Sequence, residues 1–249
     1  MFKHVIKITS ALTIVTLAGC VGIKPERMQQ YLTVVEASSS EKTPVVFMFQ
    51  GSGGNNQLSA KWTSWFKEQG VSAVWIDSAG VRGLKRLYGK NYSSDLAAAL
   101  TTVSKNNTLD LTRYAVMGFS RGGTAALQAG SSLGKDQLRP DFIFSLYPAD
   151  KGMCPNSYDE NTAVSVFYGD LDQWGSYQGN RNSCQKMAQK NDNATFYLME
   201  NSHHGYDGDW SGTWKCCGGK TFTNKPNTQT LAETKQIILS QIKEKWGEL

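Results

Sequence analysis

The chain has 249 residues, of which 40% are hydrophobic and 19% are charged, and its formal net charge is +5 at pH 7. This length suits one domain with a substantial buried core. The sequence has no basic run and no charged tail, which argues against a nucleic-acid-binding protein.

The first twenty residues are typical of an export signal. Lys3 and Lys7 precede or enter an apolar stretch that has no acidic residue and is too short to span a bilayer permanently. The stretch ends in Leu-Ala-Gly-Cys, which resembles the lipobox of bacterial lipoproteins. The resemblance implies that Cys20 becomes a diacylated N-terminus after cleavage, whereas the alternative is an ordinary signal peptide with a chance cysteine. Because Val21 rather than Asp follows, we expect a lipid anchor in the outer membrane, with the domain facing the periplasm.

Removal of the signal, residues 1–20, lowers the net charge to +3, because Lys3 and Lys7 are lost with it. Segments 21–30 and 37–44 are polar, and we expect loops there. Residues 21–44 then form a tether and a first strand, and residues 45–249 form the main domain.

Apolar runs alternate with amphipathic stretches along the rest of the chain. Several runs are continuously apolar, as expected of parallel strands that are covered on both faces. The predicted strands are 32–35, 45–50, 71–76, 114–119, 142–146, 164–168 and 195–199, and the predicted helices are 58–68, 94–104, 121–130, 180–190 and 228–246. This alternation predicts an α/β fold with a doubly wound, mostly parallel central sheet flanked by helices.

A glycine-rich loop follows the strand predicted at 45–50. It reads Gly51-Ser52-Gly53-Gly54 and leads into a helix, so the backbone N–H of Gly51 or Ser52 is a candidate donor to an oxyanion. A phosphate-binding loop is the alternative, but the Lys-Ser/Thr that closes it is missing. The glycine spacing also differs from the dinucleotide-binding fingerprint.

The strand predicted at 114–119 runs into Gly-x-Ser-x-Gly, centred on Ser120, and a helix follows. This order is typical of a nucleophile elbow, in which the serine oxygen projects above the sheet from a strained turn. The amide of Arg121 then lies at a helix N-terminus and is a second candidate donor to an oxyanion. The alternative is a solvated serine in a glycine-rich turn.

Four cysteines remain after the signal, and an even number in an exported protein favours disulfides. Cys154 and Cys184 each follow a predicted strand, so we expect a disulfide between their loops. Cys216 and Cys217 either form a strained vicinal bridge or remain thiols. A zinc site is a weaker alternative, because no Cys-x-x-Cys is present and only two histidines lie outside the signal.

A serine nucleophile needs a base and an orienting acid. The base is His203 or His204, since the remaining histidine lies in the signal. The acid is expected in the turn after the strand predicted at 164–168, where Asp172 lies farther into the loop than the runner-up Asp170. The chain order Ser, acid, His is that of α/β-hydrolases.

Residues 205–226 are rich in Gly, Trp and Cys and have no clear periodicity, which predicts a long loop insertion. Because the segment directly follows the candidate base, we expect it to form a lid or rim at the site. Trp210, Trp214 and Phe222 either bind an apolar or sugar-like substrate or pack as a small core of the loop itself.

Several of these motifs, in this order, resemble the dienelactone-hydrolase-like group of the α/β-hydrolases, over about residues 45–204. The loop at 50–54 is similar to the group's His-Gly-x-Gly-Gly, with Gln50 in place of His. Asp-Ser at 77–78 with Arg-Gly at 82–83, and Tyr-Pro at 147–148 with Cys154, also resemble segments of this group, and Cys184 falls near a position where many members carry Cys.

The resemblance also implies which acid and which base belong to the site. Gly-Asp-Leu-Asp-Gln-Trp at 169–174 resembles Gly-x-x-Asp-Asp-Trp and places the acid on Asp172. His-Gly-Tyr-Asp at 204–207 resembles His-Gly-Phe-Asp and places the base on His204. Dienelactone hydrolases proper use a cysteine nucleophile, so the resemblance implies the fold and not turnover of dienelactones.

Together these features predict a serine hydrolase, and they favour a carboxylic-ester hydrolase with a Ser120–His204–Asp172 triad. Amides of Ser52 or Gly51 and of Arg121 are expected to hold the oxyanion, and no cofactor or metal is needed. The expected partners are a small ester or acyl substrate and, through the lipid anchor, the membrane. The alternatives are a serine peptidase or amidase of the same fold and an inactive envelope binding protein.

Overall fold

The computed structural model describes residues 23–53, 57–85, 92–133, 138–149 and 154–249. The predicted signal, with Cys20, lies outside these residues. One seven-stranded sheet runs through the described part in the order β1-β3-β2-β4-β5-β6-β7. All neighbouring strands are parallel except β1, which is antiparallel to β3. The strands are β1 Leu32–Val35, β2 Thr43–Phe49, β3 Ser72–Ile76, β4 Leu109–Phe119, β5 Phe142–Leu146, β6 Ala163–Gly169 and β7 Ala194–Met199.

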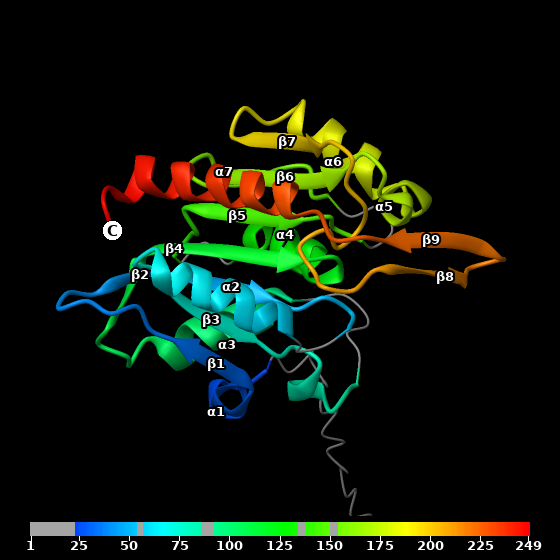
Figure 1. The fold of residues 1–249 in the computed structure, drawn as a ribbon. Helices are drawn as coiled ribbons and strands as arrows, with labels where there is room; N and C mark the ends of the chain where they lie inside the picture. Colours follow the sequence, from blue (N-terminus) through cyan, green and yellow to red (C-terminus); the bar gives the residue numbers. More distant parts are fainter. Residues whose placement is uncertain (1–22, 54–56, 86–91, 134–137, 150–153) are drawn as a thin grey trace, which may run out of the picture.

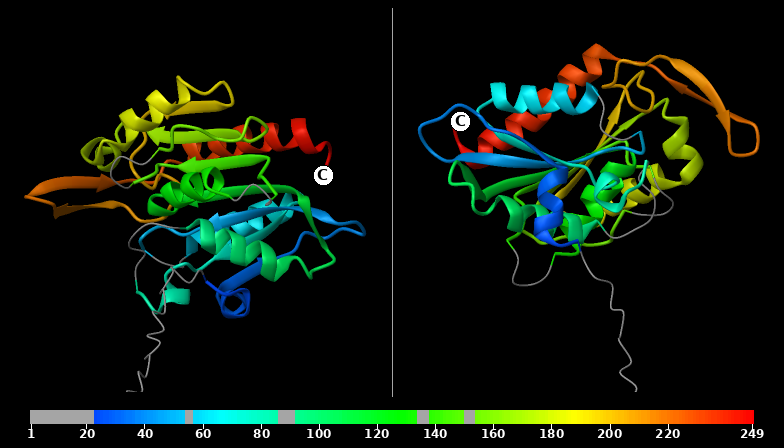
Figure 2. Two further views of the ribbon diagram at one scale, coloured as in Figure 1. Left: turned by 180° about the vertical axis from the view of Figure 1, so that it is seen from behind. Right: turned by 90° about the horizontal axis from the view of Figure 1, so that it is seen from below.

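Helices cover both faces of this sheet, as Figures 1 and 2 show. On one face lie α2 (Gln57–Glu68) and α7 (Thr228–Trp246), and on the other lie α3 (Ser93–Val103), α4 (Arg121–Ser131) and α6 (Asn180–Ala188). Every residue of β2, β3 and β5 is buried, because these strands have helices on both sides. The predicted doubly wound, mostly parallel α/β sheet is therefore confirmed.

The long C-terminal helix α7 packs through one stripe of side chains. The buried residues recur every four positions along the helix, at Thr230, Thr234, Ile238, Ile242 and Trp246. The two threonines pair with the segment that carries the candidate base, since their hydroxyls lie 2.6 Å from Ser202 Oγ and 2.9 Å from Tyr206 Oη. The helix thus fixes the chain on both sides of residues 203–205. Within the described part of the chain, no helix is both long and apolar enough to cross a membrane.

Two short helices appear where the sequence predicted loops. The helical turn α1 (Pro25–Met28) continues into the 3₁₀ turn η1 (Gln29–Tyr31), so the expectation of a loop over 21–30 is wrong for the described part of that segment. Pro25 suits the first position of a helix, and Met28 is fully buried. In the acid loop, α5 (Gln173–Gln178) begins directly after Asp172, whose carboxylate accepts a hydrogen bond from the amide of Gly175.

The sequence predicted a loop without regular structure over 205–226. The structure instead contains a β-hairpin there. Strands β8 (Gly212–Cys216) and β9 (Lys220–Asn224) pair antiparallel, with Trp214 directly opposite Phe222. The turn consists of Cys217, Gly218 and Gly219, which all have positive φ angles. This conformation favours glycine, which occupies two of the three positions. Figure 1 shows the hairpin projecting beyond the carboxyl ends of the parallel strands.

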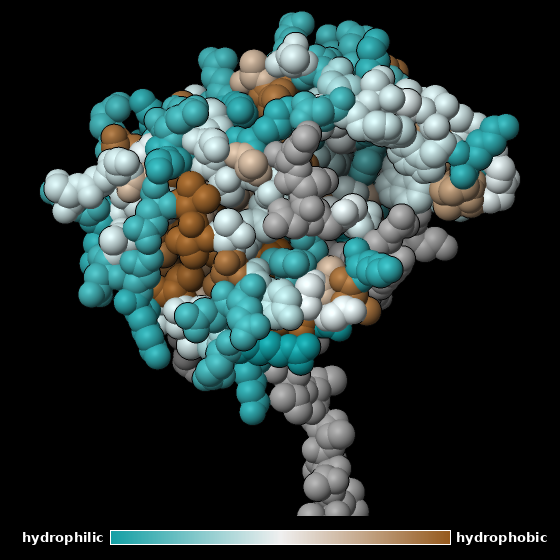
Figure 3. All heavy atoms as spheres, turned by 60° about the horizontal axis from the view of Figure 1, so that its bottom comes forward, coloured by the Kyte–Doolittle hydropathy of each residue, from teal (hydrophilic) through white to brown (hydrophobic). Residues whose placement is uncertain are grey.

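The strand β1 lies at one edge of the sheet and has only four residues. Figure 3 shows this side of the molecule, where hydrophilic residues surround an area of hydrophobic ones. Val34 in β1 is 38% exposed. A short edge strand offers few unpaired backbone groups to another chain.

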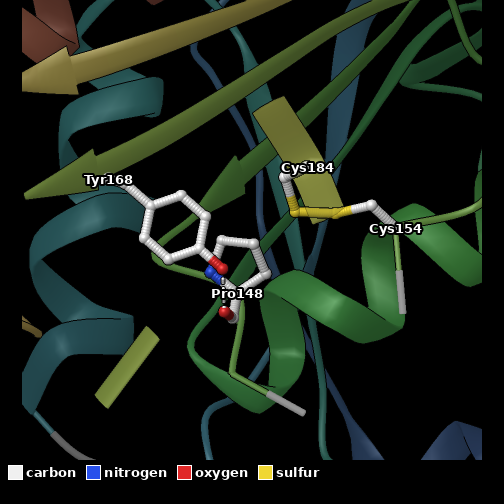
Figure 4. The surroundings of a disulfide bond; sticks show 4 residues. All are labelled: Pro148, Cys154, Tyr168 and Cys184. Carbon is white, nitrogen blue, oxygen red and sulfur yellow. Dashed lines mark hydrogen bonds between the residues drawn. A yellow bond between two sulfur atoms is a disulfide. The ribbon is translucent and has the colours of Figure 1, made fainter. Parts of the chain in front are cut away.

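The predicted disulfide between Cys154 and Cys184 is present, and it joins the segment after β5 to α6 (Figure 4). Beside it, the hydroxyl of Tyr168 donates a hydrogen bond to the carbonyl of Pro148. The bridge therefore ties helix α6 to the chain that leaves the end of β5. Cys216 and Cys217 are free thiols.

Loss of this disulfide is expected to destabilise the domain. The bridge closes a loop with a sequence separation of 30, and the chain-entropy relation gives about 3–4 kcal/mol for a loop of this size. Urea unfolding of the Cys154→Ala/Cys184→Ala variant should show this loss of unfolding free energy. A Cys216→Ser/Cys217→Ser variant is the control and should unfold like the wild type. Equal stability of all three proteins would contradict the prediction.

Candidate active site

Ser120 occupies a strained turn between the end of β4 and the start of α4. Its φ and ψ angles are 53° and −118°, which is unusual for a residue other than glycine. The turn is held in place by the next strand, because the Ser120 amide donates to the carbonyl of Leu146 at 2.9 Å. The Ser120 carbonyl in turn accepts from the amide of Ala149 at 3.1 Å.

The glycines on either side of the turn allow two backbones to approach closely. A Cβ atom added to Gly118 would lie 1.9 Å from the carbonyl oxygen of Gly122. A Cβ atom added to Gly122 would lie 2.2 Å from the carbonyl oxygen of Phe49, at the end of β2. The first turn of α4 therefore packs directly on the chain that enters the Gly51–Ser52 loop, as an elbow requires.

The structure brings Ser120, His204 and Asp172 into one hydrogen-bonded chain. His204 Nε2 lies 2.9 Å from Ser120 Oγ, and His204 Nδ1 lies 2.9 Å from Asp172 Oδ2. The Asp172 carboxylate is buried, and its other oxygen accepts the amide of Gly175 at 2.9 Å. Both carboxylate oxygens are thus fixed, and the acid can hold the imidazole in one orientation and tautomer.

The neighbouring candidates, Asp170 and His203, lie elsewhere. The Asp170 carboxylate accepts the amide of Ser202 at 3.1 Å. Partial burial raises its pKa, but hydrogen bonds from the amides of Ser202 and Asn201 outweigh this effect, and the pKa is lowered overall. Asp170 and His203 line a second hollow, which Asp172 and Tyr177 also line, and neither is among the described residues that line the cavity with Ser120. Asp170 therefore shapes the loop, and Asp172 faces the imidazole.

The glycine-rich loop lies beside Ser120, as predicted. A Cβ atom added to Gly51 would lie 3.3 Å from the carbonyl oxygen of Phe119 and 3.6 Å from Ser120 Cβ. Ser52 lines the same cavity as Ser120, and helix α4 begins at Arg121. The structure thus places the backbones of Gly51, Ser52 and Arg121 around the serine, where amide donors can stabilise an oxyanion.

Buried polar side chains anchor this loop from below. The side-chain amide of Gln50 donates to Asp77 Oδ1 at 2.9 Å, and the same oxygen accepts a hydrogen bond from the backbone N–H of Gly80 at 2.7 Å. Nearby, Arg82 donates two hydrogen bonds, at 2.7 and 2.6 Å, to the fully buried carboxylate of Asp95. Asp77 therefore supports the loop through Gln50, whereas Arg82 binds Asp95 and the carbonyl of Ser78.

Tyr147 contacts the imidazole, and the sequence analysis assigned it no role. Its ring packs edge-on against His204 with 4.8 Å between centroids. Its hydroxyl donates to Asp207 Oδ1 at 2.5 Å, and Trp62 Nε1 donates to the other oxygen at 2.8 Å. Burial raises the pKa of Tyr147 well above its ordinary value, so the phenol stays a neutral donor. Tyr147 and Asp207 each belong to a motif noted in the sequence, but only the fold shows that their side chains form a hydrogen bond.

A cavity of about 860 Å³ opens beside Ser120. The glycine-rich loop, the end of β4 and the β8–β9 hairpin form its walls, so the prediction that residues 205–226 form part of the rim agrees with the structure. The lining includes Gly51, Ser52, Gly53, Leu58, Trp75, Phe119, Tyr147, Trp174, His204, Trp210, Trp214, Cys216 and Cys217. Phe222 is instead buried and forms the core of the hairpin.

Comparison with known proteins assigns the fold. No family model and no curated protein sequence matches the chain. Its structure is similar to that of a "Putative Dienelactone Hydrolase" from Klebsiella pneumoniae, with 12% identity, a TM-score of 0.64, and coverage of 85% of this chain and 98% of the other. It is also similar to Est1E from Butyrivibrio proteoclasticus with ferulic acid bound, with 14% identity, a TM-score of 0.58, and coverage of 85% and 94%.

A third similar structure is a tributyrin phosphonate complex of esterase B from Lactobacillus rhamnosis. The identity is 14%, the TM-score is 0.62, and the match covers 87% of this chain and 81% of the other. Together these likenesses show that the domain has the α/β-hydrolase fold. In this fold, ligands bind at the carboxyl ends of the strands, which is where the Ser120 cavity lies.

Proposed function

We propose that this protein is a serine hydrolase that cleaves carboxylic esters through an acyl-enzyme. The observation that carries the proposal is the hydrogen-bonded chain from Ser120 Oγ through His204 to the buried Asp172, set on a strained elbow at the wall of an open cavity. The α/β-hydrolase fold and the esterases among the similar structures support it.

The proposed reaction follows from the geometry. Ser120 Oγ attacks the ester carbonyl while His204 Nε2 takes its proton, and Asp172 stabilises the imidazolium that forms. Amides of Gly51 or Ser52 and of Arg121 stabilise the tetrahedral oxyanion. The proton passes from His204 to the leaving alcohol as the C–O bond breaks. Water then attacks the acyl-enzyme by the same route, and the acid and free Ser120 are released.

Labelling with an alkyl fluorophosphonate tests this proposal, because the probe phosphonylates a serine that a neighbouring base activates. We expect one adduct per chain, mapped by peptide mass spectrometry to the peptide that contains Ser120. Heat-unfolded protein is the control and should not react. Absence of labelling in a well-folded sample would overturn the proposal and favour a binding protein with a hydrolase fold.

Asp172→Asn is expected to lower kcat by about 10⁴-fold, because an amide at this position favours the wrong imidazole tautomer. Asp170→Asn is the matched control from the same loop, and kcat should stay within about threefold of the wild type, since the Asp170 side chain bonds the backbone and not His204. Steady-state hydrolysis of p-nitrophenyl acetate measures both variants. Comparable losses in the two would refute the assignment of the acid.

We also propose that the mature protein begins at a lipidated Cys20, as the Leu-Ala-Gly-Cys sequence indicates. Metabolic labelling with an azido fatty acid in a Gram-negative host should mark the wild type. A Cys20→Ala variant should remain unlabelled and keep its uncleaved signal. Equal labelling of the two proteins would contradict the proposal.

A further inference from the structure

The cavity beside Ser120 has an aromatic floor that the sheet holds rigidly. Trp75 and Phe119, at the ends of β3 and β4, stack with 5.8 Å between centroids and an interplanar angle of 26°. Trp62 packs behind Phe119 at 5.7 Å. These three rings are almost fully buried. The floor is therefore rigid but offers little exposed ring surface, and Trp210, which also lines the cavity, is far more exposed.

The β8–β9 hairpin supplies a facing aromatic wall. Exposure alternates along β8, because Trp214 and Cys216 face the cavity while Thr213 and Lys215 face solvent. Trp214 stacks on the buried Phe222 with 5.6 Å between centroids and an interplanar angle of 24°. Phe222 thus supports Trp214 from within the hairpin.

Two further indole rings complete the rim. Trp174, at the start of α5, lies 4.7 Å from Phe222 between centroids. Trp210 lies 5.8 Å from Trp214 and is 54% exposed, although it lines the cavity. A large aromatic ring left exposed at a cavity rim is available to contact a ligand.

The described residues of the cavity lining carry no formal charge. Among the described residues that line it, none is Asp, Glu, Lys or Arg. Asp209, next to Trp210, lies in the adjoining groove and is paired with Lys61 at 2.5 Å. A carboxylate group placed between these rings would lose its hydration without a charged partner.

We infer that the substrate is an ester that carries an aromatic ring and no negative charge, and that the ring binds in this cavity against Trp214 and Trp210 of the hairpin segment. This inference rests on the proposed ester hydrolysis and adds the chemical class of the substrate. Contact between aromatic rings adds to the burial of apolar surface, by a factor of roughly 2 to 10 in affinity for each good contact.

Matched esters test the inference on the wild-type enzyme. Methyl 3-phenylpropanoate is compared with methyl 3-cyclohexylpropanoate, and benzyl acetate with cyclohexylmethyl acetate. In at least one pair, kcat/KM for the phenyl compound should be higher by about 2- to 10-fold, and that pair identifies the side of the ester that carries the ring. Methyl 3-(4-carboxyphenyl)propanoate should react at least about 100-fold more slowly than its uncharged parent.

Variants of the hairpin test whether Trp214 causes the preference for the phenyl ester. Trp214→Ala should lower kcat/KM for the preferred phenyl ester by about 10-fold or more, and Trp214→Phe should restore most of it. In both variants, kcat/KM for methyl acetate should fall by a smaller factor than kcat/KM for the phenyl ester. Lys215→Ala, on the opposite face of the same strand, is the control and should leave all rates unchanged. Trp210→Ala removes a ring that is 54% exposed and should lower the same rate by a smaller factor.

The outcomes separate this inference from the proposed function. Normal labelling and methyl acetate turnover with no preference for either phenyl ester would overturn the inference and leave the hydrolase standing. A preference for acetylated monosaccharides or for the carboxylated ester would also overturn it. If the wild type neither labels nor hydrolyses any ester, the proposed function and the inference fail together.

Discussion

Replacement of Ser120 by Ala is expected to lower kcat for ester hydrolysis on the order of 10⁶-fold, and the fold should stay intact. The proposed acyl-enzyme cannot form without Ser120 Oγ, and residual catalysis would come from the oxyanion donors and substrate binding alone. Ser120 already has a positive φ in the wild type. Ala has a Cβ atom as Ser does, so the substitution adds no new backbone strain. Steady-state hydrolysis of p-nitrophenyl acetate measures the loss.

Two controls make this result specific. Urea unfolding should show that Ser120→Ala is folded, and fluorophosphonate labelling of the variant should be absent. Gly122→Ala is the contrasting change, because its Cβ would lie 2.2 Å from the carbonyl oxygen of Phe49 and should destabilise the elbow itself. Folded Ser120→Ala protein that keeps its activity would exclude Ser120 as the nucleophile.

The second large effect is expected for His204→Ala, with a loss in kcat of about 10⁴- to 10⁶-fold. His204 is the residue whose imidazole lies within hydrogen-bonding distance of both Ser120 Oγ and Asp172 Oδ2. Without it, Ser120 has no base and the leaving alcohol has no acid. Added imidazole should restore part of the activity of the variant, because the cavity next to the serine is open.

The adjacent His203 provides the matched control. It lines the second hollow with Asp170 and is not among the described residues that line the cavity beside Ser120, so His203→Ala should keep kcat within about threefold of the wild type. Pre-steady-state release of p-nitrophenol should show an acyl-enzyme burst in the His203 variant and none in the His204 variant. The opposite result would move the base to His203.

Most of the sheet and its helices could be predicted from local patterns. Continuous apolar runs marked the parallel strands because both faces of those strands are buried, as in β2 and β5. The helix at 228–246 was predicted with the bounds that α7 has, although Thr230 and Thr234 extend its buried stripe beyond the apolar residues. The start of β4 at Leu109 was missed, since the polar residues Asp110, Thr112 and Arg113, none of them buried, interrupt the apolar run.

The hairpin was missed for a different reason. Polar and apolar residues alternate over 213–216, but the run is short, and β9 offers Phe222 as its one hydrophobic residue, so the pattern was too brief to predict two strands. What holds the hairpin is contact between rings, above all Trp214 on Phe222 and Phe222 on Trp174 of α5. Contacts between segments that far apart in the chain are set by the fold and not by local propensity.

The sequence by itself determined the order of the strands and helices, the position of the elbow, and the short set of residues from which a base and an acid had to come. These follow from local rules, since glycine permits the close approach at 118 and 122 and the chain has few histidines. Only the tertiary structure decided that Tyr147 and Asp207 support the imidazole and that the hairpin walls the cavity. Side chains from separate loops meet there because parallel strands end at one edge of the sheet, and the distances between them depend on how the whole sheet is packed.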